Sequence, residues 1–154
     1  MRVSVFAMAL ILQPTVAGAA NFAVACTGTA YAENNLSGPV SKSTDQLPKQ
    51  VYVIDEDSKT VRRALFPRQQ FDKVCPSSKG DPSVDISPGL ILVTGPPDFG
   101  ENSVTCSLEL DRQTGHAVFK LSMTFSGERY NNLRWDMICD KAPVPVFTPK
   151  KNKF

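Results

Sequence analysis

SVTCSLELDRQTGHAVFKLSMTF, residues 103–125, contains two runs in which apolar and polar residues alternate. Apolar residues occupy even positions from Val104 to Leu110 and odd positions from Ala117 to Phe125. A period of two puts one set of side chains on a buried face, and a short link ending in Gly115 predicts a β-hairpin. The change from even to odd fixes the register, so the numbers of facing residues should add up to 227.

Shorter stretches of β-type sequence lie on both sides of this hairpin, separated by segments rich in Gly and Pro. Strands are expected in 21–31, 51–66, 84–93 and 133–139. The polar segment 32–50 is expected to be a long loop. We therefore predict an all-β fold, an antiparallel meander forming a small sandwich or partly closed barrel of about seven strands.

The segment 51–66 resembles a second hairpin in which Asp55 takes the place of Asp111. In both, the carboxylate can accept backbone N–H groups of the following turn. One residue does not fit, because Arg63 occupies a position that should be buried. This predicts that its strand lies at an edge or rim, where the guanidinium can reach water.

The N-terminus has the pattern of a secretory signal peptide. Arg2 precedes an apolar run at 3–12, and Ala17-Gly18-Ala19 fits a cleavage site. The apolar run is too short to span a bilayer. We expect a signal peptide at 1–19, one β domain at 20–142, a Pro- and Lys-rich tail at 143–154, and a periplasmic or secreted location.

The charge is close to neutral, with 17 Lys and Arg against 15 acidic residues. Removal of Arg2 with the leader would leave 16 cations, which argues against nucleic acid or an acidic membrane as the partner.

Four cysteines in an exported chain predict two disulfides, for which three pairings are possible. If the first and last strands are neighbours, as closure of a barrel requires, Cys26 pairs with Cys139. Cys75 then pairs with Cys106 and ties a Pro-rich loop to the central hairpin. A Cys26–Cys75 peptide in an unreduced digest would contradict this assignment.

The sequence contains no familiar catalytic motif. His116 is the only histidine and is expected to face solvent without a positioned partner. The acidic cluster Asp55-Glu56-Asp57 lacks the spacing of a calcium-binding loop, and a charged hairpin tip accounts for it. We expect no cofactor, no metal and no enzymatic activity; a hydrolase using only Asp and Glu would need two carboxylates that converge in a cleft.

The motif Ser126-Gly127-Glu128-Arg129-Tyr130 has the form S-G-x-x-Y. It resembles the loop motif of membrane-bound and periplasmic lysozyme inhibitors of the MliC type, which are small disulfide-bonded β-barrels. The resemblance implies that Ser126 and Tyr130 would enter the lysozyme cleft and that an envelope protein such as lysozyme would be the partner. The second motif of that family, a Tyr followed by Thr or Ser, Lys and Gly, is missing.

A wider resemblance covers most of the chain after the leader. Its elements are Phe22-x-Val24-x-Cys26-x-Gly28, a strand ending in Asp55, the 110–115 turn, Cys139-Asp140-Lys141-Ala142-Pro143 and a terminal Lys153-Phe154. These are similar to small exported β-proteins of alphaproteobacteria. The resemblance implies an exported location and a β fold, and it implies no particular activity. The sequence thus predicts an exported, non-catalytic binding or structural module of unknown ligand, with a lysozyme-inhibitor-like protein as the alternative.

Overall fold

The structure, a computed structural model, describes residues 21–96, 98–99, 102–126 and 128–147. The expected signal peptide at 1–19 and the end of the tail therefore lie outside the described residues. One short 3-10 helix, Phe66–Arg68, and ten strands are present in the described part. The strands are β1 (Asn21–Asn34), β2 (Ser41–Asp55), β3 (Thr60–Leu65), β4 (Gln70–Lys73), β5 (Ser83–Ile86), β6 (Leu90–Thr94), β7 (Asp98–Phe99), β8 (Ser103–Asp111), β9 (His116–Phe125) and β10 (Arg129–Ala142).

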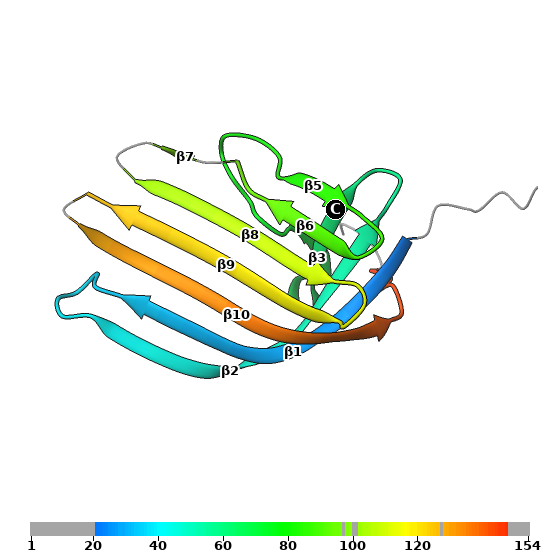
Figure 1. Cartoon of the computed structure of the whole chain (residues 1–154), viewed down its shortest axis with the longest axis horizontal. Coiled ribbons are helices and arrows are strands. Elements are labelled where there is room, and N and C mark those ends of the chain that lie inside the picture. Colours follow the sequence, from blue (N-terminus) through cyan, green and yellow to red (C-terminus); the bar gives the residue numbers. More distant parts are fainter. Residues whose placement is uncertain (1–20, 97, 100–101, 127, 148–154) are drawn as a thin grey trace, which may run out of the picture.

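All strands belong to one antiparallel sheet with the order β4-β3-β2-β1-β10-β9-β8-β6-β5, and β7 adds to β8. The chain starts in the middle of the sheet, runs outward to β4, crosses to the opposite edge and returns through β5 to β10 (Figure 1). The expected all-β antiparallel fold is confirmed. The expectation of about seven strands was too low, because the sheet has nine strands in line, and these curve into a half-barrel.

The central hairpin has the register that the sequence predicts. Leu110 faces Ala117, and Cys106 faces Leu121. The oxygen Oδ1 of Asp111 accepts the backbone N–H of Gln113 at 2.8 Å and that of Thr114 at 3.0 Å. Gly115 ends the four-residue turn with a φ of 72°, which a glycine adopts without a steric penalty. The expected hairpins β2–β3 and β5–β6 are also present.

The expected loop at 32–50 is not present, because most of it forms a long hairpin between β1 and β2. The pairing shifts by one residue between Cys26 and Gly28, so a bulge interrupts it. Pro48 lies in that bulge, where a missing N–H costs no ladder hydrogen bond. On the other side of β1, a Cβ at Gly28 would lie 2.0 Å from the carbonyl oxygen of Asp136, so the two backbones meet there.

The hydrophobic core covers the inner face of the half-barrel. Its largest fully buried side chains include Tyr52, Ile54, Ile91, Leu108 and Met137. Half-buried apolar residues, among them Ala30, Leu121 and Trp135, extend this surface along the same face. A smaller cluster on the outer face contains Ala23, Val51 and Ala64, and Phe147 of the C-terminal segment packs against it. Residues 143–147 carry no regular secondary structure, as the prolines predict.

The two disulfides join Cys26 to Cys139 and Cys75 to Cys106, the pairing expected from the neighbouring first and last strands. The reason differs from the one expected. Strands β1 and β10 are neighbours in the middle of the sheet (Figure 1), so Cys26–Cys139 does not close a barrel. Cys75 follows the edge strand β4, and its bond to Cys106 on β8 ties one edge of the half-barrel to the opposite half.

Arg112 joins the hairpins at one end of the half-barrel. Its Nη2 atom lies 2.7 Å from Oε1 of Glu56 in the β2–β3 turn. Its Nη1 atom donates to the carbonyl oxygen of Ser87 in the β5–β6 turn at 3.0 Å. The guanidinium lies 5.5 Å from the centre of the Phe22 ring on β1. One side chain therefore contacts both halves of the curved sheet.

The expectation that the strand of Arg63 lies at an edge was wrong. Strand β3 lies between β2 and β4, and Arg63 faces Tyr52 on one side and Asp72 on the other. Because Tyr52 belongs to the core, this row of side chains points to the inner face. The guanidinium reaches across that face toward Trp135.

Candidate functional site

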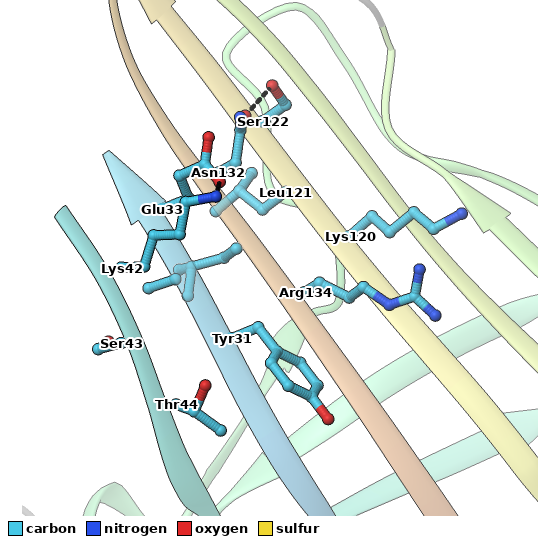
Figure 2. Close-up of a pocket in the computed structure, with 12 residues that line it drawn as sticks. Tyr31, Glu33, Lys42, Ser43, Thr44, Lys120, Leu121, Ser122, Asn132 and Arg134 are labelled. Atoms are coloured by element: carbon cyan, nitrogen blue, oxygen red, sulfur yellow. Dashed lines mark hydrogen bonds and ion pairs between the residues drawn. The ribbon is translucent and has the colours of Figure 1, made fainter. Parts of the chain in front are cut away.

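A groove of about 470 Å³ crosses strands β2, β1, β10 and β9 (Figure 2). Facing residues of neighbouring strands share a face, so the register defines the two walls. The first wall is the row Thr44, Tyr31, Arg134 and Lys120, and the second is the row Lys42, Glu33, Asn132 and Ser122.

The floor of the groove is mostly backbone. Residues Ser43, Ala32, Leu133 and Leu121 lie between the two walls and point their side chains to the other face. Leu121 packs against the core there, so the groove belongs to the outer face. A segment of another molecule lying in it would meet main-chain groups below and polar side chains on both sides.

Most charges along the groove are paired within the protein. Lys42 Nζ lies 2.9 Å from Oε2 of Glu33, and the hydroxyl of Tyr130 donates to Oε1 of Glu33 at 2.8 Å. The hydrogen bond from Lys42, followed by that from Tyr130, lowers the pKa of Glu33. The bond to Glu33 raises the pKa of both donors. The second wall is therefore a closed network with no net charge.

The first wall differs, because Lys120, one of its two cations, makes no ion pair with any described residue. Arg134 forms three hydrogen bonds with Asp136, from Nε at 3.0 and 3.1 Å and from Nη2 at 2.9 Å, and this contact raises the pKa of Arg134. Lys120 faces Arg134 and is exposed, without an ion pair in the described ranges. Tyr31, 41% exposed, faces Arg134 from the other side. The wall thus offers an exposed aromatic ring and an unneutralised ammonium on opposite sides of Arg134.

Ser126 and Tyr130, the residues singled out by the S-G-x-x-Y motif, lie at the same end of the sheet. Ser126 is exposed, and its carbonyl oxygen accepts Nε of Arg129 at 3.4 Å. Tyr130 is the second residue of β10 and is half-buried, with its hydroxyl engaged by Glu33. Gly127 between them lies outside the described residues.

Asn35 attaches this loop to the tip of the β1–β2 hairpin. Its Oδ1 accepts the backbone N–H of Tyr130 at 2.7 Å, and its Nδ2 donates to the carbonyl oxygen of Glu128 at 3.0 Å. A backbone bond from Asn35 N–H to the carbonyl oxygen of Tyr130 at 3.2 Å adds a third contact. The two tips are therefore held together, although they are about ninety residues apart in sequence.

The other candidates from the sequence have structural roles. Asp55 accepts the backbone N–H of Ser58 at 2.9 Å, and Glu56 pairs with Arg112. His116 is exposed and faces Ile138 on the outer surface. No group of three metal-binding side chains occurs in the described ranges. Glu33, the carboxylate that lines the groove, is engaged by Lys42 and Tyr130.

The groove was missed at the level of sequence because five of its lining residues, three of them in its walls, were assigned to a loop. Glu33, Lys42 and Thr44 lie in the segment 32–50. The only available signal was the alternation of Ala30 and Ala32 with Tyr31 and Glu33. Alanine is only weakly apolar, so this alternation is too faint to indicate a strand.

The fold and the site define an antiparallel, disulfide-bonded half-barrel with a polar groove on its outer face. No family model, no curated protein and no solved structure matches the chain. None of the helical residues in the described ranges forms a segment of the length and hydropathy needed to cross a bilayer. The two disulfides fit an oxidising compartment.

Proposed function

We propose that the protein is an exported, non-catalytic binding module that holds an acidic segment of a partner protein in the outer groove. The observation that carries the proposal is the first wall, where Lys120 is left without an ion-pair partner among the described residues and Tyr31 exposes its ring on the other side of Arg134. Aromatic side chains and cations with surrounding polar contacts are typical of protein interfaces. Paired strands form the walls of the groove, so binding needs little ordering of the site.

The proposal is tested by capture of partners from envelope extract with the protein lacking residues 1–19. We expect a bound protein that is retained by the wild type, is lost with Lys120→Glu and is released by salt, since the contact is electrostatic. Ile138→Ser is the matched control, because Ile138 lies on β10 on the same face, is 56% exposed and lies outside the groove. Equal capture by Lys120→Glu and the wild type would refute the groove as the binding surface.

A lysozyme-inhibitor-like function is the second candidate. It is favoured by the position of Ser126, which is exposed on a short loop that Asn35 attaches to the adjacent hairpin tip. A pre-ordered polar loop of this kind suits insertion into a concave site. The engagement of the Tyr130 hydroxyl by Glu33 opposes a direct role for that residue.

Lysozyme activity measured against increasing protein concentration separates this candidate from the first. The inhibitor function predicts stoichiometric inhibition that Ser126→Asp abolishes and Lys120→Glu leaves unchanged. Absence of inhibition at a large molar excess of the protein would exclude it.

A further inference from the structure

Arg63 places a cation on the inner face of the half-barrel, in surroundings that are otherwise mostly apolar. Its guanidinium carbon lies 5.9 Å from the centre of the Trp135 ring. Its Nε atom is buried and has no hydrogen-bond partner among the described residues. Of the two residues that flank Arg63 in the sheet, Tyr52 is buried, and Asp72 accepts a bond from Gln70 and forms no ion pair with Arg63 among the described residues.

The tyrosine beside Arg63 shows how apolar this region is. Burial raises the pKa of Tyr52 to about 12, although the positive charge of Arg63 acts in the opposite direction. Among the described residues, the hydroxyl of Tyr52 has only the sulfur of Met137 as a partner, at 4.0 Å. On the side of β2, Arg63 therefore meets no strong acceptor among the described residues.

An apolar strip leads from Arg63 toward the end of the sheet that carries the β1–β2 tip. Trp135 packs on Phe119 with ring centres 4.5 Å apart. Ala30 on β1 faces Trp135 on β10. Leu121 lies two residues along β9 from Phe119, on the same face. All except Phe119 are half-buried and border the core, so this strip is partly open to a ligand.

A guanidinium in such a place is costly unless it is paired. Burying a charge away from water is unfavourable, and a contact with an aromatic ring offsets only part of that cost. A carboxylate would form a charge-assisted, two-point contact with the guanidinium. The one carboxylate farther along this face, Asp45 opposite Ala30, is exposed and makes no ion pair with Arg63 among the described residues.

We infer that the inner face binds a small amphipathic anion, with its carboxylate on Arg63 and its alkyl chain along Trp135 and Leu121. The guanidinium selects the charged end, and the apolar strip sets the direction of the chain. This site lies on the face of the sheet opposite the outer groove, so either could be occupied without the other.

Trp135 is the only tryptophan in the chain, so its fluorescence reports directly on this site. Laurate is titrated below its micelle concentration into the protein lacking residues 1–19. We expect a saturable change in Trp135 emission, with dodecanol, which has the same chain length and no charge, binding at least tenfold more weakly.

The matched pair of variants is Arg63→Gln and Arg62→Gln. Arg62 is the preceding residue, is exposed and points to the opposite face, so its substitution removes the same charge without touching the site. Arg63→Gln should weaken laurate binding at least tenfold, and Arg62→Gln should leave it unchanged. Circular dichroism checks that both variants are folded. If Arg63→Gln does not fold, Arg63→Lys serves as a second variant.

Three results would overturn the inference: no saturable signal with the wild type, equal binding of laurate and dodecanol, or equal binding by the two glutamine variants. Loss of partner capture by Lys120→Glu has no bearing on it, because that variant should bind laurate as the wild type does.

Discussion

At the scale of single residues, Gly28 shows how closely the two central strands approach. Its missing side chain leaves room for the carbonyl group of Asp136 on the neighbouring strand, and its φ is not positive. The requirement for glycine here is therefore one of space and not of backbone conformation. The same sequence position marks the bulge that lets β1 continue to Asn34.

Gly28→Ala is expected to lower the free energy of unfolding by about 1–3 kcal/mol, because a methyl group would have to displace backbone atoms of β10. Urea denaturation measures the change. Gly89→Ala is the control: the nearest atom to its Cβ would be Nε2 of Gln113 at 3.9 Å, so the effect should stay within about 0.5 kcal/mol. Similar losses for the two variants would contradict the steric explanation.

At the scale of elements, the β8–β9 turn depends on one carboxylate. Hydrogen bonds from the backbone N–H groups of Thr114 and Gln113 lower the pKa of Asp111. A lowered folded-state pKa adds stability that is fully present above the unfolded pKa of about 3.9 and is lost as pH falls through the folded value. The hairpin is thus strengthened at neutral pH and weakened in acid.

Asp111→Asn should therefore be less stable than the wild type at pH 7, and the difference should shrink as the pH falls below about 4. Unfolding at a series of pH values measures this convergence. Asp85→Asn removes the same charge from a side chain that makes no hydrogen bond among the described residues, and it provides the control. A constant difference between wild type and Asp111→Asn across the pH range would show that the carboxylate acts without its charge.

Elements with strong alternation could be predicted from the sequence, and those without it could not. The central hairpin alternates over its whole length, so its register followed from the parity of Leu110 and Ala117. Strand β2 begins with six exposed residues and contains Pro48, so neither a buried face nor strand propensity is visible there. Strand β2 is held by its pairing with β1, and a bulge accommodates the proline. Neither feature is local to the sequence of β2.

The groove could not be predicted from the sequence, and the assignment of Ser126 and Tyr130 to a binding site stays a prediction. The position of Ser126 and Tyr130 follows from a local motif, but the groove depends on the strand order β2-β1-β10-β9. That order brings Tyr31, Thr44, Lys120 and Arg134 into one row from four separate segments. Arg63 was misplaced for the same reason, since local sequence does not show that Trp135 lies across the interior.

At the scale of the whole molecule, Arg112 connects the two halves of the curved sheet. Arg112→Ala should lower the free energy of unfolding by about 1–2 kcal/mol, because it removes a partly screened ion pair and a hydrogen bond to a carbonyl group. It should also increase hydrogen exchange in the β2–β3 and β5–β6 turns together, since both lose the same partner.

Arg134→Ala is the control for Arg112→Ala. Its ion pair with Asp136 stays within one strand, joins no separate elements and is exposed, so the free energy of unfolding should hardly change. Faster exchange in only one of the two turns of Arg112→Ala would show that the residue supports a single hairpin and not the contact between halves.

The order of the strands has a consequence for how far the half-barrel can open. Neighbouring strands alternate in direction, so an uninterrupted row of nine leaves its two end members, β4 and β5, pointing the same way. No antiparallel ladder can join them directly. The two halves are therefore joined by the core, the Cys75–Cys106 bond and the Arg112 contacts, and not by hydrogen bonds between β4 and β5. Reducing the Cys75–Cys106 bond or replacing Arg112 should therefore widen the opening and leave the strand pairing intact.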